Sequence, residues 1–327
     1  MDETGKHIPF NQRSPYYQLF VTFIMVFVIG LVIEVILILT GMLLFGSDMD
    51  ILSDTSLATD KNDIAFLKFY MMSQTATLFL VPAIILLMKM KPEGQSGYPE
   101  FRPPRLNEVV LVVVMTFCVF VITGFTGEIN ALLDLPEWLS GLEEWIMKME
   151  DDSEQLMEKL MVVKTFPSLL LNIFMIAILP AIGEEILFRG VLQKIFVRLL
   201  KSGHFAVWLT AILFSALHLE FLGFLPRLVL GLVFGYLYLW SGKLWLSILA
   251  HFVNNAVPTI AAFIYGYENV MKTAETEIWK QAFFLPIPVV IMFVILFYIR
   301  NSNQQVSIVE TKGDSVQVNT EIKESNN

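Results

Sequence analysis

Residues 19–45 form an apolar run with a single ionisable side chain, Glu34. The run is too long for the core of a signal peptide and lacks a small-residue cleavage site, so we predict a retained membrane span. Seven further stretches meet or approach the roughly 20 apolar residues that a membrane helix needs. They are residues 66–88, 109–126, 166–200, 205–219, 224–240, 244–264 and 282–299. The expected fold is therefore an all-α, polytopic membrane bundle with about eight transmembrane helices.

The composition agrees with the membrane class. Hydrophobic residues make up 55% of the chain and charged residues only 16%, with a mean hydropathy of +0.64. A soluble domain carries more charge and fewer long apolar runs. The net charge of -9 argues against nucleic acid as a partner, since nucleic-acid-binding proteins favour a basic face. The single cysteine, Cys118, excludes an internal disulfide and a cysteine-based metal site.

The distribution of charge between the loops predicts the orientation of the bundle. The loop after the second span carries Lys89, Lys91, Arg102 and Arg105, whereas the loop after the third, residues 127–165, carries ten acidic side chains against three lysines. Positive loops lie in the cytoplasm. We therefore expect both termini to be cytoplasmic, in a multi-pass protein of the cell membrane.

The same pattern divides the chain into parts. We predict a cytoplasmic head at residues 1–18, a transmembrane bundle at 19–300 and a disordered cytoplasmic tail at 301–327. The acidic outer loop spans residues 127–165. Within it, Trp138, Leu142, Trp145, Ile146 and Met149 recur at helical spacing, which indicates an amphipathic helix resting on the outer membrane surface.

The fourth span contains a charged triplet, Glu184, Glu185 and Arg189, in an otherwise apolar setting. Ionisable side chains at bilayer depth usually mark a functional site and have a nearby partner. Glu185 and Arg189 are four residues apart and can pair along the helix. Glu184 points about 100° away from Glu185 and is free to face other spans. Pro180 is expected to kink the helix just before the glutamates.

Candidate partners for Glu184 lie on later spans. His218 lies inside the apolar stretch 205–219, and His251 lies inside 244–264 with Asn255 four residues later on the same helix face. His7 and His204 are expected to be ordinary surface or interfacial residues.

These side chains are typical of hydrolytic chemistry. A glutamate can take a proton from water, and an imidazole can orient that water. Neutral imidazoles can also bind zinc, so Glu184, His218 and His251 are candidate ligands for a Zn²⁺ ion. Asn255 can donate to a developing oxyanion. The Glu185–Arg189 pair would neutralise one carboxylate and leave Glu184 as the reactive one.

A structural alternative exists for isolated polar residues in a bundle, which often join helices and contribute only about 0.6 kcal/mol each. We assign Gln74, Asn172 and Ser215 to that class. For Glu34, packing against a polar partner is as good an explanation as a functional role. The six residues of the triplet and its partners are too many for this explanation.

At these residues the chain resembles the CPBP intramembrane protease family, also called the CAAX protease and bacteriocin-processing or Abi family. The family's three motifs match Glu184, Glu185 and Arg189, then Phe214 and His218, then His251 and Asn255. The resemblance covers residues 166–264 and implies an eight-span bundle whose site opens toward the cytoplasm. It also implies that Glu184 and His218 activate water while His251 and Asn255 stabilise the oxyanion.

The leading hypothesis is an intramembrane endopeptidase whose protein or peptide substrate enters from the membrane or the cytoplasm. One alternative is a non-catalytic membrane scaffold or bacteriocin-immunity protein of the same fold. Another is a transporter in which Glu34 and Glu184 relay protons. That reading predicts paired repeats or discontinuous helices, which the sequence does not show.

Overall fold

The computed structural model describes the chain in six stretches and two short strands. These are residues 8–58, 60–91, 101–133, 136–161, 165–274 and 283–303, with 308–309 and 317–318. His7 and most of the predicted tail lie outside the described residues.

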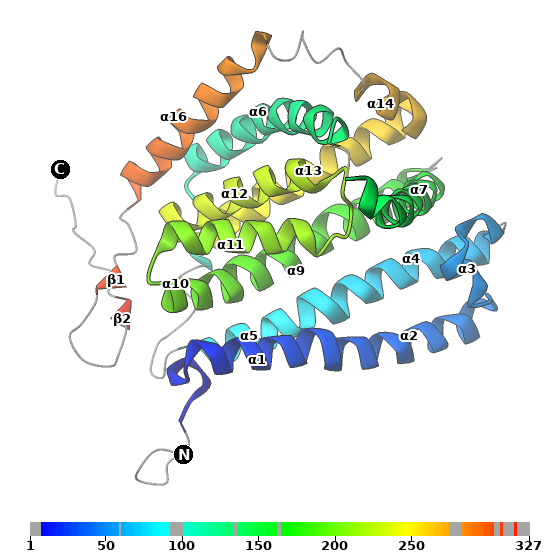
Figure 1. Ribbon diagram of the computed structural model, residues 1–327, viewed down its shortest axis with the longest axis horizontal. Coiled ribbons are helices and arrows are strands. Elements are labelled where there is room, and N and C mark those ends of the chain that lie inside the picture. The colour runs from blue at the N-terminus through cyan, green and yellow to red at the C-terminus, as the bar shows by residue number, and fades with distance from the viewer. Residues whose placement is uncertain are drawn as a thin grey trace.

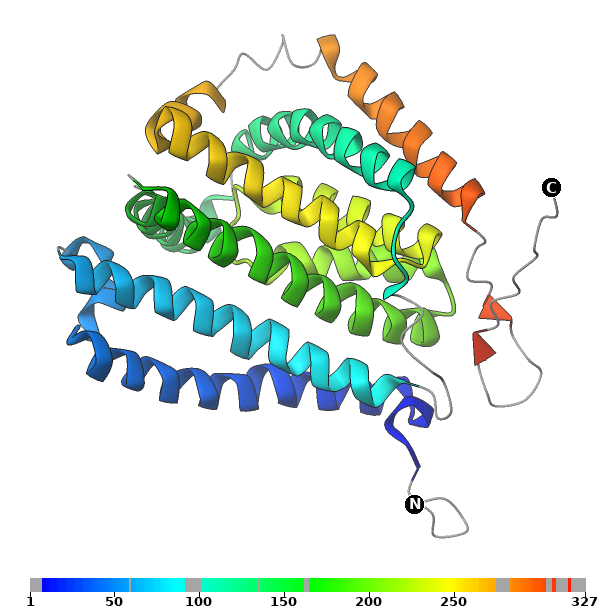
Figure 2. The ribbon, with the colours of Figure 1, turned by 180° about the vertical axis from the view of Figure 1, so that it is seen from behind.

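Long helices run roughly side by side through the molecule (Figures 1 and 2). Within the described stretches, six helical segments are long and apolar enough to cross a membrane. They are Pro15–Phe45, Lys61–Met90, Leu106–Ala131, Phe166–Leu200, Phe224–Ser241 and Leu244–Tyr265. Two shorter apolar helices, Gly203–Ala216 and Pro286–Ser302, occupy the positions of the other two predicted spans. The all-helical membrane class is confirmed, whereas helix length supports six spans and not the predicted eight.

Three of the long segments combine several labelled elements. The first joins α1 (Pro15–Phe23), η2 (Ile24–Ile29) and α2 (Gly30–Phe45); the second joins α4 (Lys61–Thr75), η4 (Ala76–Leu80) and α5 (Val81–Met90). The fourth joins α8 (Phe166–Asn172), η7 (Ile173–Ile178), α9 (Leu179–Glu185), η8 (Ile186–Gln193) and α10 (Lys194–Leu200). The other three long segments are α6 (Leu106–Ala131), α12 (Phe224–Ser241) and α13 (Leu244–Tyr265), and the two shorter apolar helices are α11 (Gly203–Ala216) and α16 (Pro286–Ser302).

The remaining helical elements lie before and between these helices. They are η1 (Phe10–Gln12), α3 (Asp50–Ser53), η3 (Thr55–Leu57), η6 (Glu137–Leu139), α7 (Ser140–Met161) and α14 (Tyr267–Ala274). Beyond α16, the strands β1 (Ile308–Val309) and β2 (Gln317–Val318) pair antiparallel. Only residues 301–303 and these two strands are described in the segment 301–327, so its predicted disorder stays a prediction.

Local sequence fixes several helix ends. Asp60 accepts from the backbone N–H groups of Asn62 and Asp63 and so caps the start of α4. Thr165 caps α8 in the same way, through the N–H of Ser168. Gly242 ends α12 at a φ of 66°, a conformation that suits glycine because it has no Cβ.

The core lies between helices that are distant in sequence. One cluster joins α6, α12, α13 and α16 and includes Met115, Phe234 and Leu237. A second cluster joins the N-terminal span to α5, α9, η8 and α13. These two clusters flank the fourth span and α13, which carry the charged triplet and His251, so the candidate site is held from both sides.

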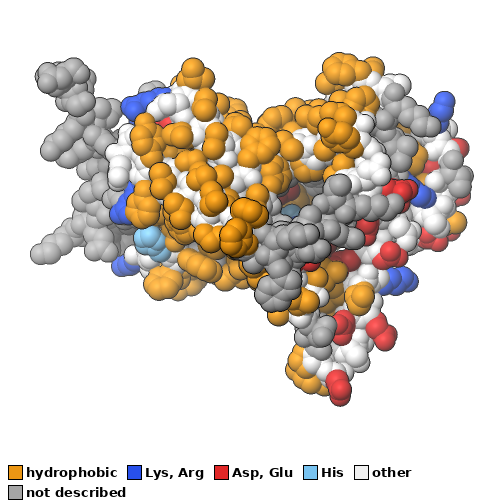
Figure 3. All heavy atoms as spheres, turned by 90° about the horizontal axis from the view of Figure 1, so that it is seen from above, with side chains coloured by type: hydrophobic (Ala, Val, Ile, Leu, Met, Phe, Trp, Pro, Cys, Tyr) orange, Lys and Arg blue, Asp and Glu red, His pale blue; other side chains and the backbone are white. Residues whose placement is uncertain are grey.

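The acid-rich end of the molecule carries α7 and α14, opposite the end where the described N-terminal residues and β1–β2 lie (Figure 1). Seen from above, hydrophobic side chains cover most of the surface, and acidic ones gather toward the α7 end (Figure 3). Helix α7 begins two residues after the predicted Trp138 and is longer than the pattern indicated. Trp138 and Trp145 remain exposed, at 80% and 53%. The predicted amphipathic helix is thus present, with much of its apolar face not packed against the described protein.

Glu34 packs against polar partners, as the structural alternative proposed. The hydroxyls of Ser73 and Thr77 each donate to one of its carboxylate oxygens, at 2.7 Å. Asn172 and Ser215 also join helices: Asn172 accepts from Lys68 on α4, and Ser215 donates to the carbonyl of Phe224. The assignment of Gln74 is wrong, because its amide donates to Tyr70 on its own helix.

Candidate active site

The two glutamates of the charged triplet lie between two widened segments of the fourth span, and Arg189 lies within the second. The π-helical segment η7 ends directly before Leu179 and Pro180, and a second, η8, begins directly after Glu185. Proline removes one backbone donor, and a wider turn is one way for a helix to accommodate that loss. Where we predicted a kink at Pro180, the helix therefore widens before the proline and again after the glutamates. Such π-helical turns are frequent at functional sites.

Glu185 is the centre of a buried ionic network. Its Oε1 lies 2.7 Å from Nη1 of Arg189 and 2.9 Å from Nδ1 of His251. Both members of the carboxylate–guanidinium pair are completely buried, and His251 is 5% exposed. An ionised carboxylate only accepts hydrogen bonds, so Nδ1 of His251 carries the proton and Nε2 is the nitrogen left for other partners. The predicted Glu185–Arg189 pair thus also orients a histidine on α13.

Arg189 is further held by aromatic rings and a backbone carbonyl. Its guanidinium carbon lies 4.8 Å from the ring centre of Phe214 and 5.5 Å from that of Phe234. Nη2 donates to the carbonyl of Gly231 on α12, at 3.2 Å. Cation–π contacts and a carbonyl acceptor compensate a buried guanidinium for lost water. Arg189 therefore joins the fourth span to α11 and α12.

Glu184 faces the second histidine. Its Oε2 lies 4.0 Å from Nε2 of His218, and this oxygen is buried without a hydrogen-bond partner. Nδ1 of His218 lies 2.7 Å from the carbonyl oxygen of Phe214, which can only accept, so Nδ1 carries the proton. Nε2 of His218 is then a hydrogen-bond acceptor that faces a second acceptor, Oε2 of Glu184. Two acceptors at this separation can share one water molecule that donates a hydrogen bond to each.

His218 does not lie inside a membrane helix, contrary to the prediction from the stretch 205–219. Helix α11 ends at Ala216, and His218 occupies the turn before α12. The backbone of the next residue, Leu219, has a φ of +56°, a left-handed conformation that non-glycine residues seldom adopt. Strained backbone of this kind concentrates at functional sites. Because of this turn, the His218 side chain approaches Glu184 from the C-terminal end of α11.

Sequence reasoning missed Asn130, which holds this turn from α6. Its Nδ2 donates to the carbonyl of Phe221 at 2.7 Å, and its Oδ1 accepts from the N–H of Leu225 at 2.9 Å. Asn130 is only 1% exposed. An amide at the end of an apolar span was a visible signal, but nothing in the sequence connected it to residues about ninety positions later.

Asn255 does not point freely into the site. Its Nδ2 donates to the backbone carbonyl of Ile176 in η7, at 3.0 Å, and its Oδ1 accepts from Asn254. His204, in contrast, is an exposed residue that contacts Tyr236, as expected for an interfacial histidine.

The three candidate zinc ligands were Glu184, His218 and His251. Across the described residues, no three or more His, Cys, Asp or Glu side chains are grouped so that they could hold a metal ion. The arrangement therefore does not fit the expected ligand set, and no step below is assigned to a metal.

Comparisons with known proteins agree with the geometry. Residues 166–257, from α8 to two residues beyond Asn255, match the family model described as type II CAAX prenyl endopeptidase Rce1-like. The chain is also 33% identical over 90 residues to the uncharacterized protein YpbD of Bacillus subtilis (strain 168). That alignment covers 26% of this chain and 43% of YpbD, so the chain spans less than half of that relative. No solved structure gave a significant match.

The matched segment contains Glu184, Glu185, Arg189, His218, His251 and Asn255, and the structure brings five of the six into two adjoining contact networks. Residues 166–257 of this chain are therefore a domain of the Rce1-like type II CAAX prenyl endopeptidase family.

Proposed function

We propose that this protein is an intramembrane endopeptidase that hydrolyses peptide bonds in membrane-associated proteins or peptides. The observation that carries the proposal is the placement of Glu184 and His218. Their acceptor atoms Oε2 and Nε2 face each other at 4.0 Å, and the Glu184 oxygen has no other partner. The family of the matched domain supports the reaction class.

The first step is activation of water between the two acceptors. Glu184 and His218 each accept a hydrogen bond from the same water. One proton of that water passes to Glu184 as the water oxygen attacks the scissile carbonyl carbon. A base within reach of water typically contributes about 10²–10⁴ in rate. When the tetrahedral intermediate collapses, the C–N bond breaks and the same proton passes to the leaving amine.

His251 supplies the oxyanion donor. For this role the ring carries a proton on both nitrogens: Nδ1–H donates to the carboxylate of Glu185, and Nε2–H donates to the negatively charged oxygen. Arg189 donates to the same carboxylate oxygen and so holds Glu185 in place. Because the charges of Glu185 and Arg189 are held by protein dipoles in a water-poor interior, these side chains need little reorganisation during the reaction.

The membrane arrangement forms part of the proposal. Eight spans, made of the six long segments with α11 and α16, place both chain ends on the cytoplasmic side, as the positive loops favour. The substrate is a protein or peptide that reaches the site from the membrane or the cytoplasm.

The test is Glu184→Gln in the purified full-length protein, with cleavage of membrane proteins followed by mass spectrometry of new termini. Glutamine keeps the size of the side chain but is a poor base, so cleavage should fall by at least about 10²-fold. The matched control is Glu34→Gln, a buried carboxylate on another helix, which should keep its activity. Cleavage retained by Glu184→Gln would favour the non-catalytic scaffold or immunity protein instead.

A further inference from the structure

Pro180 leaves one carbonyl of the fourth span without its helical donor. In a regular helix the carbonyl of Ile176 accepts from the N–H four residues later, and residue 180 is a proline, which has none. The helix is widened at this point, since the N–H of Leu179 donates five residues back to Phe174, so an N–H at position 180 would serve Met175 in the widened turn and Ile176 in a regular one. A membrane interior offers no water to take the place of the missing donor. In this protein the side chain of Asn255, on α13, donates to the carbonyl of Ile176 at 3.0 Å.

The contact lies one helical turn from His251. Asn255 and His251 are four residues apart on α13, and each makes a hydrogen bond to the fourth span: Asn255 to Ile176, and His251 to Glu185. Pro180 lies between those two acceptors in the sequence. The pair of contacts fixes how far α13 is shifted and rotated against the glutamates.

We propose that Asn255 is a positioning residue that occupies the carbonyl freed by Pro180 and thereby holds His251 against Glu185. This assigns Asn255 a role different from the oxyanion donation that the resemblance implied. The inference rests on the proposed function for its activity readout only. Its stability readout is independent of any catalysis.

A double-mutant cycle tests the assignment, using Asn255→Ala, Pro180→Ala and the combination. Alanine at 180 supplies an N–H that donates to the carbonyl of Ile176 once the turn closes in the regular helical register, so the side chain of Asn255 becomes dispensable. Asn255→Ala alone should shift the unfolding equilibrium and lower kcat by about tenfold or more, because a buried acceptor is left unpaired. The double variant should return both quantities to within a few-fold of Pro180→Ala. Pro180→Ser, which also restores the N–H, repeats the test if Pro180→Ala folds poorly.

The outcomes separate the two roles. If Asn255 instead donates to the oxyanion, Asn255→Ala should lower kcat by about 10²–10³-fold, and by the same factor whether residue 180 is proline or alanine. The stability of the protein should then be unchanged. That result would overturn the proposal. If stability shows the coupling but the wild-type protein cleaves nothing, the positioning role stands and the proposed function fails.

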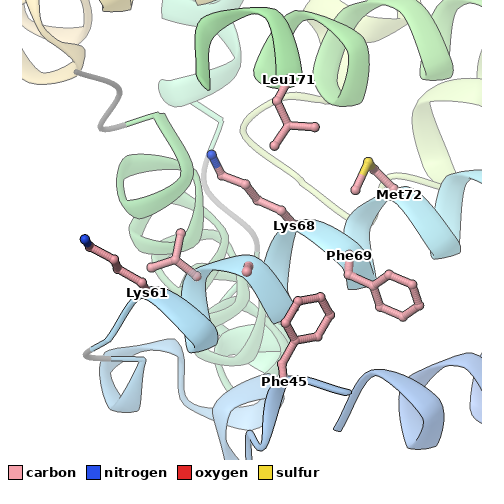
Figure 4. Close-up of a pocket in the computed structure, with 8 residues that line it drawn as sticks. Phe45, Lys61, Lys68, Phe69, Met72 and Leu171 are labelled. Atoms are coloured by element: carbon pink, nitrogen blue, oxygen red, sulfur yellow. The ribbon is translucent and has the colours of Figure 1, made fainter. Parts of the chain in front are cut away.

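An independent observation concerns a cavity of about 380 Å³ between α2, α4 and α8, away from the catalytic residues. Figure 4 shows Lys68 reaching from α4 toward Leu171, with Phe45 and Phe69 on the other side. Lys68 is 8% exposed, and its ammonium donates to the neutral amide of Asn172 at 2.9 Å. Within the described residues, no carboxylate forms an ion pair with it. Lys61, two turns earlier on the same face, lines the same cavity.

We infer that this cavity binds an anionic phospholipid. Charged side chains inside a membrane protein commonly pair with an opposite charge, and Lys68 has the neutral amide of Asn172 instead, in a cavity whose lining contains two lysines and no acidic residue. A lipid phosphate supplies the charge, since lysine binds phosphate as a point charge. The remaining lining residues, including Phe45, Phe69, Met72 and Leu171, suit an acyl chain.

The test compares lipid retention by native mass spectrometry in neutral detergent with added phosphatidylglycerol, phosphatidylcholine or inorganic phosphate. Phosphatidylglycerol should be retained and should raise the unfolding midpoint in the wild type and in Lys89→Met, a control at the other end of the same span. Both effects should disappear in Lys68→Met. Lys61→Gln, at an exposed position, should weaken retention if Lys68→Met does not fold. Equal retention by all variants, equal retention of phosphatidylcholine, or the same shift with inorganic phosphate would contradict a lipid site.

Discussion

At the residue scale, the two adjacent glutamates have different surroundings. One oxygen of Glu185 accepts from both Arg189 and His251 at full burial, whereas Glu184 offers an unpartnered oxygen to His218 across 4.0 Å. The first arrangement is saturated on that oxygen and holds helices together. The second leaves room for a reacting water. This contrast is the reason for proposing Glu184, and not Glu185, as the base.

The buried pair should be sensitive to the loss of one partner. Arg189→Met leaves the Glu185 carboxylate without its guanidinium and should lower the free energy of unfolding by roughly 3–5 kcal/mol. The combination with Glu185→Gln should recover part of that loss, because no unpaired charge remains. Denaturant unfolding in detergent micelles measures both.

The control for this comparison is Arg227→Met. Arg227 pairs with Glu220, and these side chains are 23% and 34% exposed. Removal of a partly exposed pair should lower the free energy of unfolding by only about 0–1 kcal/mol. A loss no greater in Arg189→Met than in Arg227→Met would argue against a structural role of the buried pair.

At the element scale, close helix contacts set the geometry of the site. Helix α12 approaches α11 through Gly231, where an added Cβ would lie 2.9 Å from Cβ of Ala211 and 3.0 Å from its Cα. The carbonyl of the same glycine accepts from Arg189. A shift of α12 would therefore reach the Glu185 network directly.

Gly231→Ala should lower the free energy of unfolding by about 1–3 kcal/mol, since the backbone of α11 cannot yield as a flexible side chain would. It should also reduce cleavage, because the Arg189 contact is displaced. Gly141→Ala in α7 is the matched control. Its added Cβ meets nothing within 4 Å, so stability should be unchanged or rise by up to about 1 kcal/mol. Thermal unfolding of the two variants side by side decides the point; similar midpoints would count against tight α11–α12 packing.

At the scale of the whole molecule, the proposed topology places the α3–η3 end outside and the end of α16 in the cytoplasm. In a Cys118→Ser background, Ser56→Cys should react with a membrane-impermeant maleimide in intact cells. Asn301→Cys should react only after the cells are permeabilised. Both positions are exposed in the structure. Labelling of both from outside would contradict an even number of spans.

Much of the fold followed from the sequence, because apolar runs of membrane length have few alternatives to helices. The predicted positions of all eight runs coincide with helices, although α11 and α16 are shorter than the length that spans a membrane unaided. The prediction failed where backbone detail decides the outcome. His218 belongs to a turn rather than to a span.

The sequence by itself determined the chemical groups of the site, since six polar residues in apolar spans are conspicuous in a membrane protein. It also fixed the Glu185–Arg189 pair, which depends only on the spacing within one helix. Tertiary structure decided the rest: that His251 binds Glu185, that His218 faces Glu184, and that Asn255 contacts Ile176. The physical reason is that each of these contacts joins different helices, and their rotation and shift depend on packing between residues far apart in the chain. In an apolar bundle nearly every helix face looks alike in sequence, so this packing could not be read from the pattern of residues.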